Sequence, residues 1–146
     1  MESTFEFIAI LAASLFTGAS IYINLVEHPA RMSCGTALAV TEFAPSYKRA
    51  TIMQVLLALI SFLSALAAWF MEAGVSWLFG GILIVLVIPF TAIAILPTNK
   101  QLLDPSLDKN SEKAYRLLNH WGKLHAVRSV LSLISVFVFL YSLIWV

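Results

Sequence analysis

Charged residues are scarce in this chain of 146 residues. Asp, Glu, Lys and Arg make up 12% of it, while 60% of the residues are hydrophobic. The charged share is about half of that in soluble domains. A single cysteine, Cys34, excludes an internal disulfide. The chain also lacks glycine-rich phosphate loops, paired-cysteine motifs and nucleic-acid-binding motifs, so we expect no nucleic-acid partner.

Four apolar segments are long enough to cross a bilayer as helices. A hydrocarbon core requires about 20 apolar residues per helical span, and segments 5–26, 51–71, 77–96 and 127–146 reach that length. Secretory signal peptides carry basic residues before the apolar run. Here the first basic residue is Arg31, so we expect the first segment to be a retained span. The sequence predicts one all-α domain over residues 1–146, a four-transmembrane-helix bundle whose two longer cytoplasmic connections contain short helices.

Basic residues are missing from one side of this predicted bundle. With four spans, both termini and the connection 72–76 share a side, which carries acidic but no basic residues. The other side or its edge holds Arg31, Lys48, Arg49, Lys100, Lys109, Lys113, Arg116, Lys123 and Arg128. By the positive-inside rule this second side is cytoplasmic. We therefore expect an integral protein of a bacterial inner membrane, surrounded by the lipid bilayer, with periplasmic termini; an oligomer is compatible with this arrangement.

Prolines and capping residues predict how the connections fold. Pro29 disfavours helix at the preceding His28, which predicts a break at Glu27–His28 followed by a short helix near the membrane surface. Pro97 is expected to end the third span. Asn110 or Ser111 can cap a helix that runs without a break into the fourth span.

Polar side chains gather at the basic side of all four spans. They are Asn24, Glu27, His28 and Arg31 in the first, Tyr47, Thr51 and Gln54 in the second, Thr91 and Asn99 in the third, and Trp121, His125 and Arg128 in the fourth. In the first, second and fourth sets the spacing of three and four residues places them on one helix face. Polar groups at a membrane edge are costly unless they are paired or face a polar cavity. We therefore expect one shared polar pocket.

Several of these residues also have a purely structural explanation. Arg31 and the other edge cations serve as orientation signals and interfacial anchors. An unpaired cation at Arg128 would cost about 2.5–3.5 kcal/mol, and a Glu27–Arg128 ion pair that only locks two helices is the main alternative. Trp121 fits an interfacial aromatic belt as well as a pocket. At the opposite interface the belt residues would be Trp69, Trp77, Tyr141 and Trp145.

Two histidines near one carboxylate raise the question of a metal. His28, His125 and Glu27 form a two-histidine, one-carboxylate set of the kind that binds iron, copper or zinc. No local histidine spacing typical of metal sites supports this set, and its members come from two helices. The sequence requires no cofactor, and a transition metal or haem stays an open alternative.

Four sequence blocks together carry a family resemblance. They are Glu27-His28-Pro29-Ala30-Arg31, Pro45-Ser46-Tyr47-Lys48-Arg49-Ala50, Pro97-Thr98-Asn99-Lys100 and Trp121-Gly122-Lys123-Leu124-His125-Ala126-Val127-Arg128. In combination they resemble the anthrone oxygenase-like family of small four-span membrane proteins. The resemblance implies a membrane oxidoreductase that uses dioxygen to oxidise a hydrophobic small molecule, an anthrone, to an anthraquinone.

The resemblance also implies roles for the pocket residues. His125 or His28 would act as the general base. Arg128 and Asn99 would stabilise the oxyanion that forms. Substrate binding would fall to Trp121 and Tyr47, whose rings stack on the substrate, and to Gln54, Asn24, Thr91, Arg31 and Glu27.

Two functions of other kinds use the same residues. A non-enzymatic membrane module would bind or transport a metal, haem or lipophilic ligand at the pocket. A structural membrane subunit would use the polar cluster only to pin its four helices together.

Overall fold

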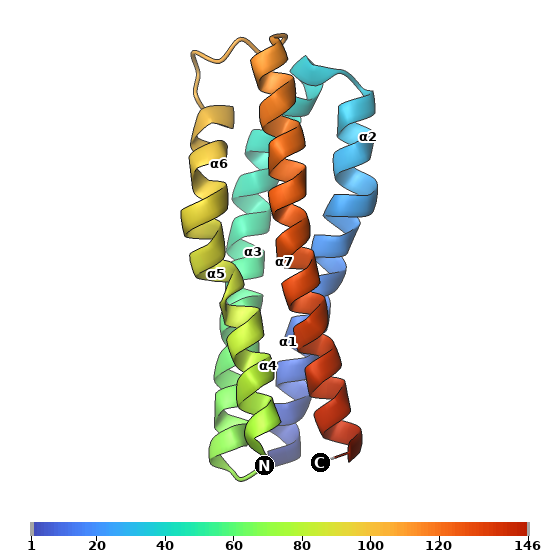
Figure 1. Ribbon diagram of the computed structural model, residues 1–146, viewed down its shortest axis with the longest axis vertical. Helices are drawn as coiled ribbons and strands as arrows, with labels where there is room; N and C mark the ends of the chain where they lie inside the picture. The colour runs from blue at the N-terminus through green and yellow to red at the C-terminus, as the bar shows by residue number, and fades with distance from the viewer. Residues whose placement is uncertain (1, 146) are drawn as a thin grey trace.

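Four long helical rods, packed side by side, form the protein (Figure 1). The structure is a computed structural model that describes residues 2–145, and this part of the chain contains no β-strand. The rods that are long and apolar enough to cross a membrane are Ser3–Ser33, Thr36–Phe70, Val75–Leu102 and Glu112–Trp145. The predicted all-α bundle of four transmembrane helices is therefore confirmed.

Short irregular segments interrupt two of the four rods. In chain order the elements are α1 (Glu2–Tyr22), the π-helix η1 (Ile23–Glu27), α2 (His28–Ser33), α3 (Thr36–Phe70), α4 (Val75–Val85), α5 (Val87–Phe90), the π-helix η2 (Thr91–Ile95), α6 (Leu96–Leu102) and α7 (Glu112–Trp145). The first rod joins α1, η1 and α2, and the third joins α4, α5, η2 and α6. The second and fourth rods are the single helices α3 and α7.

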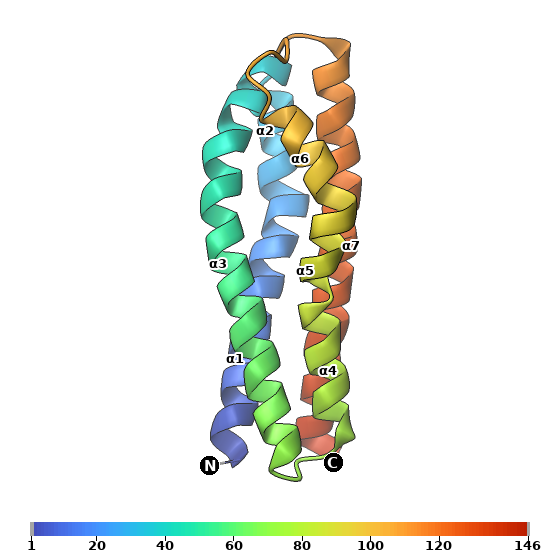
Figure 2. The same ribbon diagram turned by 90° about the vertical axis from the view of Figure 1, so that its left-hand side faces the viewer.

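The two ends of the bundle differ in charge. Both chain termini lie at one end, which we call the terminal end (Figures 1 and 2). All nine Lys and Arg residues belong to α2, α6, the first halves of α3 and α7, and the loop before α7. These segments form the opposite end, which we call the basic end.

The rods are longer than a bilayer requires. They contain 28 to 35 residues, which at 1.5 Å per residue corresponds to about 42 to 53 Å. The hydrocarbon core measures about 30 Å. Each rod is therefore long enough to cross the hydrocarbon core and to extend beyond it.

Pro29 and Pro97 do not end their rods as predicted, although the predicted boundary at Glu27–His28 is where the short helix α2 begins. Each proline occupies one of the first two positions of an α-helix that directly follows a π-helix. At the start of an α-helix the missing N–H of proline is tolerated, and the preceding π-turn absorbs the change in hydrogen-bond register. The helical rods therefore continue past both prolines.

The first connection is correspondingly short, and it contains no separate surface helix. The chain turns at Cys34–Gly35, where Gly35 has a φ of +94°, a conformation that favours glycine. Pro45 lies within α3 and does not break it. The carbonyl that loses its helical partner belongs to Thr41, which is exposed, so water can reach it.

The second connection is a loop over residues 103–111. Asp104 accepts hydrogen bonds from the backbone N–H of Ser106 at 2.8 Å and from its hydroxyl at 2.7 Å. These bonds hold the pKa of the Asp104 carboxyl below its usual value. Ser111 Oγ accepts a hydrogen bond from the N–H of Ala114 at 3.2 Å. The predicted cap at Ser111 is thus present, and α7 runs unbroken into the fourth span.

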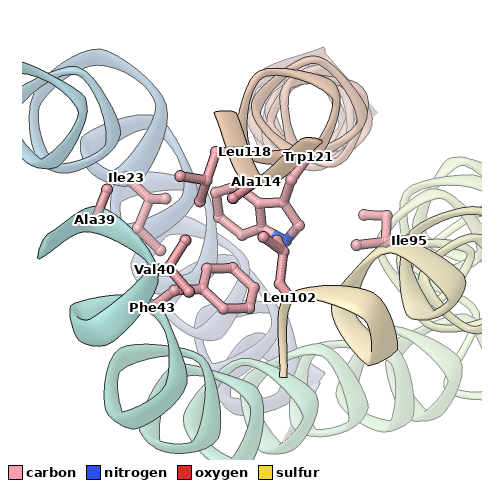
Figure 3. Close-up of a cluster of buried hydrophobic side chains, with 9 residues drawn as sticks. All are labelled: Ile23, Ala39, Val40, Phe43, Ile95, Leu102, Ala114, Leu118 and Trp121. Atoms are coloured by element: carbon pink, nitrogen blue, oxygen red, sulfur yellow. The ribbon is translucent and has the colours of Figure 1, made fainter. Parts of the chain in front are cut away.

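Each end of the bundle has its own apolar core. At the terminal end the core consists of Ala9, Ala13, Ala65, Ala68, Trp77 and Phe139. Trp77 is 1% exposed and stacks on Phe139, so its assignment to an interfacial belt is wrong. At the basic end, Trp121 of α7 points between Phe43 of α3 and Leu102 of α6 (Figure 3). This second core borders the polar residues predicted from the sequence.

Candidate functional site

A small polar cavity lies between the four rods at the basic end. We call it the polar chamber; it is lined by Ile23, Arg31, Phe43, Ser46, Tyr47, Ala50, Thr51, Gln54, Ile95, Asn99, Trp121, His125 and Arg128. Its volume of about 20 Å³ suits a group of roughly the size of one water molecule. Seven of the eleven residues with predicted roles line it; Asn24, Glu27, His28 and Thr91 do not.

His125 is held by a hydrogen-bond network that crosses from α7 to the first rod. The Asn24 amide N–H donates to the carbonyl oxygen of Gly122 at 3.0 Å, which leaves Asn24 Oδ1 as an acceptor. That oxygen lies 2.7 Å from His125 Nδ1 and accepts a hydrogen bond from the Ser129 hydroxyl at 2.6 Å. His125 Nδ1 must therefore carry a proton when the ring is neutral, and Nε2 keeps the free lone pair.

Arg128 is paired with an amide and an aromatic ring. Its Nη2 donates to Gln54 Oε1 at 2.6 Å, and its guanidinium lies over the Phe16 ring at 5.5 Å. The predicted Glu27–Arg128 ion pair is absent from the described residues. Glu27 instead pairs with Arg31, four residues further along the same helix face. Arg128 thus connects α7 to α3 and α1.

A cluster of charged residues around Arg31 lies beside the polar chamber, near the first connection. Buried Arg31 pairs with Glu27 and, through Nε, with Glu42 Oε2 at 2.8 Å. The Ser46 hydroxyl donates to Glu27 Oε1 at 2.7 Å. Arg31 also lies over the Trp121 ring at 5.8 Å. This cluster gives Arg31 a structural role in addition to the predicted role as an orientation signal.

Trp121 forms the centre of an aromatic group at the polar chamber. Its ring stacks on His125 at 4.8 Å and meets Phe43 edge-on at 5.3 Å. His28 packs on it at 5.2 Å but does not line the chamber. Tyr47 stacks on Phe43 at 5.7 Å. Trp121 therefore belongs to the buried site and not to an exposed aromatic belt.

Several polar atoms at the polar chamber have no hydrogen-bond partner within residues 2–145. They are both side-chain amide atoms of Asn99, the indole Nε1 of Trp121 and Nε of Arg128. Asn99 is 1% exposed. Figure 3 shows the indole nitrogen turned toward Leu102 of α6, the helix that carries Asn99. Buried polar groups are almost always satisfied, so these atoms indicate a place for water or for a polar group of a ligand.

A second cavity, which we call the apolar chamber, adjoins the first. It is lined by Phe16, Thr51, Gln54, Val55, Val87, Ile88, Thr91, Ala92, Leu96 and Arg128 and has a volume of about 190 Å³. Thr91, which was predicted to face the polar pocket, lines this cavity instead, and its hydroxyl donates to the Val87 carbonyl at 2.6 Å. The two chambers share Thr51, Gln54 and Arg128.

A family model described as anthrone oxygenase matches residues 43–138. The chain belongs to the anthrone oxygenase family. The matched residues include most of α3 and α7 and all of the third rod, and hence Tyr47, Gln54, Asn99, His125 and Arg128. Asn24, Glu27, His28 and Arg31 lie before the match. No curated protein and no solved structure matches the chain.

The three candidate metal ligands do not converge. Glu27 is engaged by Arg31 and Ser46, and His28 lies outside the polar chamber. Among the described residues, no group of three or more His, Cys, Asp or Glu side chains is placed to hold a metal ion. A metal or haem in this family member therefore stays a prediction that metal analysis and an absorption spectrum of the purified protein would test.

Three site residues were missed in the sequence. Ser129 was overlooked although it follows His125 by four residues and thus shares its helix face. Ser46 and Glu42 bind the Glu27–Arg31 pair from α3. No local spacing reveals this, because the contact depends on the turn at Gly35, which folds α3 back against α2. Exposed His120 lies outside the site, as its position beside Trp121 suggests.

Proposed function

We propose that this member of the anthrone oxygenase family is a membrane-embedded oxygenase. Its substrate would be a flat hydrophobic aromatic molecule, of anthrone or quinone type, whose polar group enters the polar chamber. The observation that carries the proposal is the arrangement around His125. A histidine with a defined lone pair lines a chamber where Asn99, Trp121 and Arg128 offer donors that have no partner among residues 2–145.

The proposed reaction balances without an external reductant. A base removes a proton from the methylene carbon of the anthrone, and the charge is shared with the carbonyl oxygen. The resulting carbanion bonds to dioxygen and, after protonation, gives a hydroperoxide. Loss of the second C–H proton and cleavage of the O–O bond release water and leave a new carbonyl. One oxygen atom is thus incorporated, the other becomes water, and the substrate supplies all the electrons.

The chain offers a base and an oxyanion site for this sequence. His125 acts as the general base, with Asn24 and Ser129 as positioning residues for its ring. Arg128 and Asn99 stabilise the charge that develops on the carbonyl oxygen of the substrate, and the indole N–H of Trp121 adds a third donor. His28, which lies outside the polar chamber against Trp121, supports the aromatic group and is the poorer candidate for the base.

Oxygen uptake by purified protein in lipid nanodiscs, with anthrone as the substrate, tests the proposal directly. We expect uptake above the uncatalysed rate, with anthraquinone as the product and one atom of labelled dioxygen in it. His125→Ala should abolish the increase, and exposed His120→Ala should leave it unchanged. Folded protein with no uptake above background would contradict the oxygenase function and favour a binding or structural role.

We further propose that the basic end faces the cytoplasm of a bacterial inner membrane. The positive-inside rule supports this orientation, because all nine basic residues occur at that end. In a Cys34→Ser background, a cysteine at Ser3 should react with an impermeant thiol reagent from outside. A cysteine at Asp108 should react only after the membrane is opened. The reverse pattern would overturn the orientation.

A further inference from the structure

The apolar chamber opens sideways, toward the surface of the bundle that lipid covers. Val55 on α3 and Ala92 on η2 both line it and are both exposed. Val55 lies within the predicted apolar segment 51–71, and Ala92 within 77–96. The mouth of the chamber is therefore in contact with the hydrocarbon of the bilayer and not with water.

The size and lining of this chamber suit an aromatic ring. Its volume is about 190 Å³, whereas an engineered apolar cavity of about 150 Å³ in another protein binds benzene. Aliphatic and aromatic side chains form most of its wall. The hydroxyl of Thr91 is satisfied by the Val87 carbonyl and adds no unpaired polar group. The Thr91 hydroxyl therefore keeps its partner when a ring enters the chamber.

Arg128 and Gln54 stand where the two chambers meet. Their hydrogen bond of 2.6 Å joins α7 to α3 at residues that line both cavities. The Arg128 guanidinium already lies over one aromatic ring, that of Phe16. A planar cation of this kind stacks on aromatic faces and also donates hydrogen bonds to oxygen. It therefore suits a ligand whose rings lie on one side and whose oxygen lies on the other.

We infer that the apolar chamber is the ring-binding subsite for a planar lipophilic aromatic ligand, which enters it laterally from the bilayer. The ring system occupies the chamber and its mouth, and a carbonyl or phenol oxygen passes Gln54 and Arg128 into the polar chamber. Only the identity of the reacting group rests on the proposed oxygenase function. The binding of the ring system requires no turnover and can be measured without it.

The neighbouring residues Ala92 and Ile93 provide a matched test. Both lie on η2 and are exposed, but only Ala92 lines the apolar chamber. We would measure the affinity of 1,8-dihydroxyanthraquinone for protein in nanodiscs from the change in its absorbance. Ala92→Trp should weaken binding by about tenfold or more, because the indole fills the chamber. Ile93→Trp should remain within about twofold of the wild type, as expected for a surface change.

A second variant protects the test against misfolding. Val55→Trp fills the chamber from the opposite wall and should reproduce the loss if Ala92→Trp fails to fold. Equal affinities for Ala92→Trp, Val55→Trp and Ile93→Trp, all folded, would overturn the subsite even if the protein takes up oxygen. Conversely, selective loss of binding in the chamber variants of a protein without oxygen uptake would leave the subsite intact and contradict the oxygenase function.

Discussion

The terminal end and the basic end of this bundle use the same four rods but pack them by different means. At the terminal end, alanines and glycines bring the helices together, and Trp77 stacks on Phe139 at 5.3 Å. Buried hydroxyls there bond to the backbone of another helix, Ser61 to Ala9 at 2.9 Å and Ser135 to Gly80 at 2.7 Å. That end is well packed, and its hydroxyls are largely satisfied.

At the basic end, polar side chains bond mainly to one another and leave some donors unused. A buried polar group without a partner costs about 1–3 kcal/mol, and Asn99 and Trp121 both contribute such atoms. These unpaired atoms lie at the polar chamber, which His125 also lines. The comparison therefore teaches that the terminal end contributes stability, while the basic end gives up part of its stability at the proposed binding site.

Substitution of His125 should produce the largest effect. His125→Gln removes the proposed base, and we expect kcat to fall by about 10²–10⁴-fold, the usual contribution of general base catalysis. The free energy of unfolding should change much less than the activity. Oxygen uptake and chemical denaturation in detergent measure the two quantities, with His120→Gln as the control. Full activity in His125→Gln would contradict the proposed role of His125 as the general base, and with it the functional difference between the two ends.

Gly80→Ala should have the next largest effect, and on stability. A Cβ at this position would lie 2.4 Å from Cε1 of Phe139, whose ring is fixed by Trp77. Such overpacking costs about 1–3 kcal/mol, of which the better helix propensity of alanine returns up to about 1 kcal/mol. Denaturation in detergent should show the loss, whereas the activity per folded molecule should stay constant. Unchanged stability would contradict the close packing described for the terminal end.

Gly122→Ala is the matched change at the basic end. Its Cβ would lie 2.7 Å from Nε2 of His28, the far end of a side chain that can move. We expect stability close to that of the wild type but a shifted Trp121–His28 contact. Displacement of a positioning group by about 1 Å can lower the rate by up to about 10²-fold. Indole fluorescence would report the shifted Trp121–His28 contact, and oxygen uptake would report the lower rate. A loss of stability as large as that of Gly80→Ala would show that the two ends are packed equally tightly.

Arg116→Gln should have the smallest effect, although it also lies at the basic end. The Arg116–Glu112 pair is separated by 3.9 Å and both side chains are about 70% exposed, so its contribution is about 0–1 kcal/mol. Neither unfolding nor oxygen uptake should change measurably. A large effect here would mean that the charge of the basic end as a whole matters, and not the buried residues around His125.

Features that depend on composition and local signals were predictable from the sequence. The four apolar runs revealed the four rods, and Ser111 revealed where α7 begins. The spacing of Trp121, His125 and Arg128 placed them correctly on one face of α7, because that helix is regular throughout. Because α3 and α7 are both single continuous helices, the order of the spans was enough to predict that these residues lie near Gln54 of α3.

Predictions failed where a helix is irregular or where partners compete. Pro29 and Pro97 suggested helix ends. The rods continue past them because each follows a π-turn, and such a turn has no evident sequence signal. Glu27 was matched with Arg128 by depth, but Arg31 lies one helical turn away and takes that carboxylate. Thr91 and Asn99 face different chambers, since η2 rotates the helix between them.

The π-turn of η1 gives the first rod one residue that it can lose without turning the side chains that follow. Successive residues of an α-helix are rotated by about 100° around the helix axis, and a π-turn accommodates one residue more than the α-helical register allows. Loss of one codon within residues 23–27 would remove this extra residue and restore a uniform α-helix. His28 and Arg31 would then keep their direction toward Trp121. The same deletion within the regular helix α7 has no extra residue to remove, so it would turn every later side chain of that helix by about 100°.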